Sequence, residues 1–328
     1  MATRRQHYVW KHHLNEWRND RGNIVCLTHD NGKIFSTNPI NVMLERDFYK
    51  LSNITSRDKQ FLESGLIATA PDPIRDLIRE TIQTLSFPTI IEGNMRLTTG
   101  TPEAEALKKY LQDLTVELQE KLHQEIEANA IPIIQQLRHK NVDFLQNEQE
   151  SMHFFRYIGH QYLRTKKMRD RSFDYLLGVV DGEDFSHLRN VYCFCYATII
   201  GFMLHVFKEK LEFRFLDNAS DVGFITGDQP VVNLLMDNGL DPPQHLVMYY
   251  PLKPDRALLL SFRGCGMKMI TLDKDSIRMF NNAIAYQSEY AIISNSDSVL
   301  KCIRDDPPST PPSFHHLFED LTYNPTDP

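Results

Sequence analysis

The chain has 328 residues, of which 41% are hydrophobic and 24% are charged, and its formal net charge is −7. This composition supports one large domain or two closely packed ones, and the negative charge excludes a general nucleic-acid coat while leaving room for a local basic patch. Five cysteines without a Cys-x-x-Cys pair favour neither a disulfide framework nor a cysteine zinc site, and they indicate a reducing compartment.

The sequence gives no sign of export or of a membrane span. Its first residues contain no apolar segment of signal-peptide length. No window of about 18 uncharged apolar residues occurs, and the nearest case, residues 191–207, includes His205 and is read as a buried helix. We therefore expect a cytoplasmic protein with no membrane partner.

Residues 1–20 form a basic, aromatic stretch that includes Arg5 and His7. It is either a solvated arm or an arm that contacts phosphate or a metal ion. His12 and His13 are neighbours in sequence and would point apart on a helix, so they make a poor chelating pair. Residues 23–36 then place Asn31-Gly32 between two short apolar runs, a pattern that predicts a β-hairpin.

The middle of the chain, residues 56–208, has helical periodicity with a break at Pro71 and Pro73. Thr101 followed by Pro102 predicts the start of a long helix that reaches about residue 139 and is kinked by Pro132.

His123 and Glu127 lie one turn apart on this long helix. Their spacing can hold a metal ion or a proton-transfer pair, and it also occurs on solvated helix faces. A further helix is predicted over 148–170. Its basic end, residues 165–171, would meet the negative end of the helix dipole and would then need no function.

Strand-like patterns begin after Glu209. Within them, Phe224 to Val232 reads as strand, tight turn and strand, with Asp228 at the turn. Asp228 is either a site carboxylate or simply a turn-former. The candidate strands are 211–216, 222–226, 231–236, 246–252 and 257–262. A helix over 276–288 and a short strand at 290–293 follow.

The predicted fold class is therefore α+β, with an N-terminal β-hairpin, a helical middle and a mainly antiparallel C-terminal sheet over 211–300. We expect residues 1–306 to form a single domain. Residues 307–328 contain five prolines and are predicted to be a flexible tail that folding does not need.

Several short motifs, in order, resemble a bacterial and fungal domain family of unknown function. The family opens with a His-Tyr-Val-Pro-Gln…Leu signature, which is similar to the chain from His7 to Leu14. Its Phe-Ile-Thr-Ser-Asp-Asn-Pro-Val signature resembles residues 224–231, and a Tyr-Pro-Leu-x-Pro block follows at 250–254. Three further stretches look like its other blocks: 32–49, Ile126-Glu127 and 155–165.

The chain departs from these signatures at a few positions. Trp10-Lys11 stands where the family has Pro-Gln, and Gly227 and Gln229 stand where it usually has Ser and Asn. The polar residues of the motifs are kept: His7, Glu127, Arg164, Thr226 and Asp228. The resemblance covers roughly residues 4–300 and implies anti-phage defence as a context, because some family members are associated with it.

One hypothesis is a metal-dependent nuclease or phosphodiesterase of host defence. His7, Arg164 and Asp228 would be catalytic, because histidine transfers protons near neutral pH and arginine matches phosphate oxygens. Asp228 and Glu127 would bind Mg or Mn. Gln161, Thr226 and Arg5 would contact a nucleic-acid or nucleotide substrate, and a phage product would be the trigger.

Two other hypotheses use the same residues. In a non-enzymatic sensor, the buried His/Arg/Asp network would recognise a phage or nucleotide-like ligand. In a structural role, Arg164 and Asp228 would form an ion pair that joins the helices to the sheet. The predicted arrangement brings His7, Gln161 and Arg164 to the turn at Asp228, with Glu127 nearby.

Overall fold

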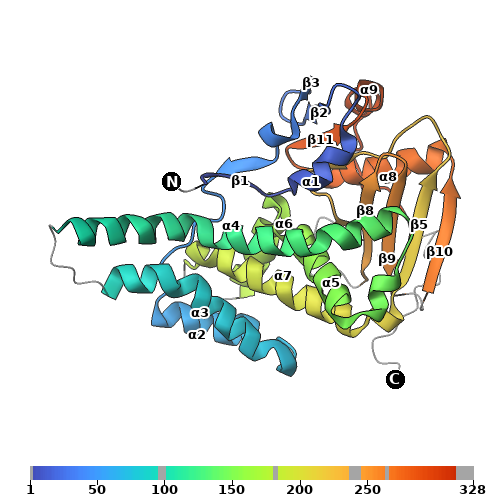
Figure 1. Cartoon of the computed structure of the whole chain (residues 1–328). Helices are drawn as coiled ribbons and strands as arrows, with labels where there is room; N and C mark the ends of the chain where they lie inside the picture. The colour runs from blue at the N-terminus through green and yellow to red at the C-terminus, as the bar shows by residue number, and fades with distance from the viewer. Residues whose placement is uncertain (1–2, 95–100, 180–183, 236–244, 263–265, 315–328) are drawn as a thin grey trace. The chain divides into compact units, whose positions relative to one another are not determined.

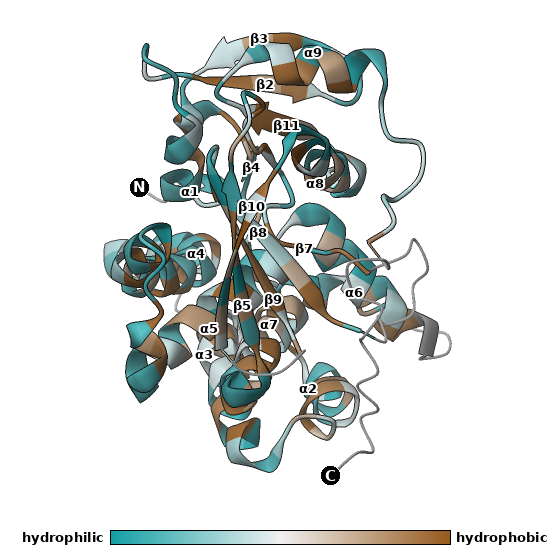
Figure 2. Cartoon of the chain, turned by 90° about the vertical axis from the view of Figure 1, so that its right-hand side faces the viewer, coloured by the Kyte–Doolittle hydropathy of each residue, from teal (hydrophilic) through white to brown (hydrophobic). Residues whose placement is uncertain are grey.

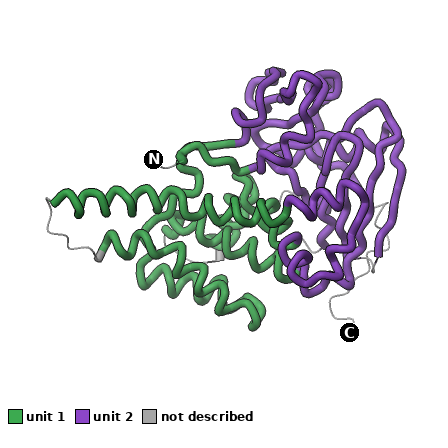
Figure 3. Tube along the Cα trace, in the orientation of Figure 1, with its two compact units in different colours: residues 1–8, 44–130, 155–203 green, residues 9–43, 131–154, 204–328 purple. Residues whose placement is uncertain are grey.

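The computed structural model describes residues 3–94, 101–179, 184–235, 245–262 and 266–314 (Figure 1). The chain forms two compact units (Figure 3). Unit 1 comprises residues 1–8, 44–130 and 155–203, and unit 2 comprises 9–43, 131–154 and 204–328.

Unit 1 is mainly helical. A two-stranded ribbon, β1 (Arg5–His7) and β4 (Leu44–Arg46), joins its N-terminal residues to the rest. The Thr101 hydroxyl accepts the backbone N–H of Ala104 at 3.2 Å, which confirms the predicted N-cap of the long helix. The helices that contribute to unit 1 are α2 (Ser56–Leu62), α3 (Asp72–Asn94), α4 (Pro102–Arg138), α5 (Glu148–Leu163), α6 (Lys166–Val179) and α7 (Arg189–Val206).

The helix predicted over 148–170 is in fact two helices. α5 ends at Leu163 and α6 begins at Lys166. The basic run at 165–171 therefore opens a helix instead of closing one. Cations at a helix N-terminus face the positive end of its dipole, so the dipole does not account for this run, and the prediction was wrong on this point.

Unit 2 contains two sheets. The predicted hairpin is confirmed as β2 (Ile24–Thr28) and β3 (Ile34–Thr37), and Gly32 has a φ of 63°, which suits glycine. The four-stranded sheet has the order β3-β2-β11-β6, and its strands β2 and β11 are coloured largely brown in Figure 2, as apolar strands are. The other strands and helices of this unit are α1 (Lys11–Leu14), β5 (Glu212–Asn218), β6 (Thr226–Gly227), β7 (Val232–Asn233), β8 (Val247–Lys253), β9 (Arg256–Ser261), β10 (Gly266–Leu272), α8 (Lys274–Gln287), β11 (Ala291–Ser294) and α9 (Asp297–Asp305).

The second sheet of unit 2 has the order β10-β5-β9-β8-β7. Its pairs are antiparallel except for β10 with β5, which is parallel. The α+β class with a mainly antiparallel C-terminal sheet is therefore confirmed. The strand predicted to reach residue 236 ends at Asn233, and residue 236 itself lies outside the described residues.

The stretch from Phe224 to Val232 is not the local strand-turn-strand that its pattern predicts. β6 pairs with β11 in the four-stranded sheet, whereas β7 pairs with β8 in the five-stranded sheet. Asp228 thus lies where the chain passes from one sheet to the other.

The predicted tail begins with a docked residue. Phe314 is 1% exposed and its ring centroid lies 5.1 Å from that of Phe280 in the core of unit 2. A chain cut at Asp306 would lose this burial, so we expect the cut to lower stability; that folding does not need residues 307–328 stays a prediction. Residues 315–328 lie outside the described residues, and the prediction of a single domain over 1–306 stays a prediction.

Candidate functional site

The predicted site residues divide between the two units. Unit 1 contains Arg5, His7, Glu127, Gln161 and Arg164, and unit 2 contains Thr226 and Asp228. The predicted approach of His7 and Arg164 to Asp228 joins residues of different units and stays a prediction. The geometry within each unit is nevertheless informative.

Arg164 is held by partners inside unit 1. Its side chain is 4% exposed, and its Nη2 lies 2.5 Å from a carboxylate oxygen of Glu127. Its Nε donates to the backbone carbonyl of Tyr8 at 3.0 Å. Burial raises the pKa of Glu127 to about 7, although Arg164 opposes the rise. Arg164 therefore links α5 to α4 and to the end of β1.

We expect Glu127 to make the protein less stable as pH rises. The unfolded carboxyl titrates near 4.5 and the folded one near 7, so the folded state holds an extra proton between these values. The contribution of this proton to the free energy of unfolding is fully present below the pKa of the unfolded carboxyl. About 2–3 kcal/mol of it is lost as the pH rises through about 7. The measurement is the free energy of unfolding at pH 5 and pH 8.

The Glu127→Gln variant is the comparison, because glutamine does not titrate. Its loss of stability between pH 5 and pH 8 should be smaller than that of the wild-type chain by this amount. Asp228 contributes in the same direction in both proteins, so it cancels. Equal pH dependence in the two proteins would contradict the raised pKa of Glu127.

Asp228 in unit 2 is anchored by backbone donors. Its carboxylate accepts the N–H of Glu289 at 3.0 Å and of Tyr290 at 2.8 Å, directly after α8. Burial raises the pKa of Asp228 to about 6, and these hydrogen bonds oppose the rise. Asp228 thus fastens the connection between α8 and β11.

Thr226 takes part in a buried hydrogen-bond chain that the sequence does not predict. The Thr226 hydroxyl lies 2.9 Å from Nε2 of His13, and Nδ1 of His13 lies 3.1 Å from the Tyr250 hydroxyl. Burial and nearby Arg138 lower the pKa of His13 well below its usual value, so this imidazole is neutral. The chain Thr226–His13–Tyr250 is satisfied without any ligand.

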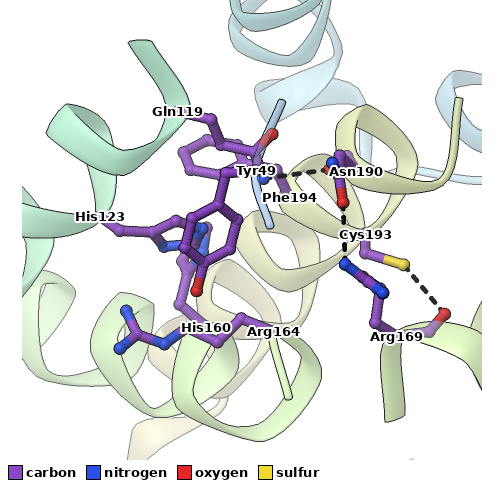
Figure 4. Close-up of a pocket in the computed structure, with 9 residues that line it drawn as sticks. All are labelled: Tyr49, Gln119, His123, His160, Arg164, Arg169, Asn190, Cys193 and Phe194. Carbon is purple, nitrogen blue, oxygen red and sulfur yellow. Dashed lines mark hydrogen bonds between the residues drawn. The ribbon is translucent and has the colours of Figure 1, made fainter. Parts of the chain in front are cut away.

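Unit 1 contains a small pocket between helices (Figure 4). The space that its walls enclose is about that of one water molecule. This is far below the roughly 300–1,000 Å³ of most ligand sites. It is lined by Tyr49, Gln119, His123, His160, Arg164, Arg169, Asn190, Cys193 and Phe194.

Two neighbouring side chains of α4 have unmet hydrogen-bonding capacity at this pocket. Gln119 and His123 project from the same helix toward Tyr49 in Figure 4. His123 is 2% exposed, and neither of its ring nitrogens has a hydrogen-bond partner among the described residues. The Oε1 of Gln119 also has no partner there, whereas its Nε2 donates to the carbonyl of Asn190 at 3.3 Å. Buried polar groups without partners are rare in native proteins.

The imidazoles at the pocket are neutral bases. Burial, with help from Arg164, lowers the pKa of His123 well below its usual value, and burial with Arg156 does the same for His160. A neutral imidazole has one N–H donor and one acceptor nitrogen. His123 can therefore hold a group that offers both an acceptor and a donor.

Aromatic rings form part of the pocket wall. The ring centroid of His123 lies 4.6 Å from that of Tyr49 and 5.1 Å from that of Phe194. Asn190 donates to the backbone carbonyls of Phe48 and Lys50, at 3.0 and 3.1 Å, and so fixes the segment that contains Tyr49. The helical spacing of Gln119 and His123 on an apolar stripe is the signal that could have found this pocket from sequence.

Neither predicted metal ligand is free of protein partners. Glu127 pairs with Arg164, and Asp228 accepts two backbone N–H groups. Across the parts of the chain that the structure describes, no group of three or more His, Cys, Asp or Glu residues is arranged to hold a metal ion. In the same parts, no helix is both long and apolar enough to cross a membrane.

A family model described as a protein of unknown function (DUF4238) matches residues 5–184 and 194–298. The chain belongs to the DUF4238 family. This confirms the resemblance to a domain family of unknown function. No curated protein and no solved structure matches. The DUF4238 match includes every residue of the pocket except Asn190 and Cys193, which fall in the short gap between its two segments.

Proposed function

We propose that this DUF4238 protein is a cytoplasmic binding module that recognises a nucleotide-like ligand through the pocket of unit 1. The observation that carries the proposal is His123, a buried neutral imidazole with both ring nitrogens unpartnered at the pocket. The edge of a nucleobase offers donors and acceptors side by side, and proteins read it with such groups.

The side chains of the lining match the chemistry of a base. Tyr49 and Phe194 supply aromatic surface, and bases stack on such side chains. Gln119 adds a carbonyl acceptor next to His123. Because the enclosed space is about that of one water molecule, a base enters only when the side chains of the lining move apart, and the sugar and phosphates stay outside.

The competing hypothesis is a metal-dependent nuclease or phosphodiesterase that uses His7, Arg164 and Asp228, with Glu127 and Asp228 holding Mg or Mn. It would require the carboxylate oxygens to exchange their present partners for the ion. An anti-phage role with a phage-derived trigger rests on the family resemblance alone. Both proposals remain compatible with a nucleic-acid or nucleotide partner.

The first test is calorimetric titration with adenosine, guanosine, cytidine and uridine. We expect at least one of these nucleosides to bind. His123→Phe keeps an aromatic ring but removes both hydrogen-bonding atoms, so we expect it to weaken binding about tenfold or more. His153→Phe is the control, because His153 is only partly buried and does not line the pocket.

Two outcomes would count against the binding proposal. The first is that no nucleoside binds, or that His123→Phe binds as tightly as the wild-type chain. The second is cleavage of DNA, RNA or tRNA in Mg or Mn that Asp228→Asn abolishes while the melting temperature stays the same. That second result would favour the hydrolase.

A further inference from the structure

The β1–β4 ribbon of unit 1 places two arginines directly opposite each other. Arg5 of β1 pairs with Arg46 of β4 in the antiparallel register. Opposed residues of such a pair lie on the same face of the ribbon, and like charges there are destabilising. Both side chains are exposed, and that of Arg46 is 72% exposed.

The carboxylates of the ribbon do not balance this charge. Asp47 lies 3.2 Å from Arg4 and 3.8 Å from Arg46, so the two arginines share it. Arg5 has no ion pair with any described residue. Arg5 was predicted from the sequence to contact a substrate, and its exposed position on the ribbon is compatible with that role.

The start of α6 adds further positive charge beside β4. Nζ of Lys166 lies 3.8 Å from Glu45. The ribbon and the start of α6 together carry four positive and two negative side chains. The positive ones are Arg4, Arg5, Arg46 and Lys166, and the negative ones are Glu45 and Asp47. The local net charge is thus +2 in a chain whose total is −7. The dipole of α6 does not compensate Lys166, since it lies at the helix N-terminus.

The inner side of the same ribbon holds a wall of the pocket. Gln6, between Arg5 and His7, is buried, and its Oε1 accepts the backbone N–H of Tyr49 at 2.8 Å. The carbonyl of His7 accepts the Tyr49 hydroxyl at 3.1 Å. Tyr49 therefore connects the ribbon that carries Arg5 to the pocket.

We propose that the outer face of the β1–β4 ribbon binds the phosphodiester backbone of a single-stranded nucleic acid. This inference rests on the proposed function, because it assumes that one unstacked base enters the pocket. Arg5 and Arg46 each contact a phosphate, and the phosphates relieve the repulsion between the two guanidinium groups. Lys166 adds long-range attraction.

The test is the salt dependence of binding to a mixed-sequence single-stranded oligonucleotide. For single strands the slope of log Kobs against log salt is about −0.7 for each neutralised phosphate. We expect the double variant Arg5→Gln/Arg46→Gln to make this slope about 1.4 units less steep. The control is Arg57→Gln/Lys59→Gln, which removes two exposed charges from α2 of the same unit.

Failure of this inference can be told apart from failure of the proposed function. If uncharged nucleosides bind but the ribbon variant keeps the wild-type slope, the ribbon inference is overturned and the pocket stands. If the ribbon variant flattens the slope but nucleosides do not bind, the ribbon binds phosphate and the pocket proposal fails. Equal effects of the ribbon variant and the α2 control overturn the ribbon inference.

Discussion

Replacing Arg164 with Met is expected to lower the free energy of unfolding by about 3–5 kcal/mol at pH 8. The change leaves the carboxylate of Glu127 buried without its counter-charge, and the carbonyl of Tyr8 without its donor. A buried charge that loses its partner is among the most destabilising single changes. The measurement is chemical denaturation of the wild-type chain and the variant.

The double variant Arg164→Met/Glu127→Leu separates the lost pair from lost packing. Because it removes both charges, much of the lost stability should return. Arg79→Met is the matched control, since Arg79 pairs with Glu63 and Asp76 at the exposed surface of the same unit and should change stability little. A single Arg164→Met variant as stable as that control would contradict the structural role of the pair.

Gly159→Ala is expected to destabilise unit 1 by about 3 kcal/mol, since a side chain has no room there. A Cβ at Gly159 would collide with the carbonyl oxygen of Ala197 and lie 2.9 Å from the backbone nitrogen of Gly201 on α7. The glycine thus allows α5 and α7 to pack with their backbones in contact. Thermal unfolding of the variant measures the effect.

Gly93→Ala near the end of α3 is the control for this prediction. A Cβ there would meet nothing within 4 Å, and alanine favours a helix over glycine. Its melting temperature should stay the same or rise. If Gly159→Ala behaved like Gly93→Ala, the close packing of α5 against α7 would be disproved.

The fold class could be predicted because it follows from local sequence patterns. Asn31-Gly32 marks the hairpin, and Thr101 marks the start of the long helix. The sequence-based predictions fail where the structure depends on pairing partners that are distant in sequence. β6 and β7 find their partners in β11 and β8, which no pattern near Asp228 reveals. The break between α5 and α6 has no proline or glycine to announce it.

The site was harder to predict than the fold. The motif residues drew attention to Arg164 and Glu127, and the structure pairs them directly. His123 was visible only as a helical neighbour of Glu127. Its importance comes from burial without hydrogen-bond partners, which depends on packing from Tyr49 and Phe194 and cannot be read from spacing.

The most direct test of the central claim is nitrogen NMR of the His123 side chain in protein labelled with ¹⁵N-histidine. The His123→Phe variant assigns its signals. On addition of an equal mixture of AMP, GMP, CMP and UMP, we predict that both ring nitrogens shift as each gains a hydrogen-bond partner, while the ring stays neutral. Unchanged His123 signals at saturating nucleotide would contradict recognition of a nucleobase by this pocket.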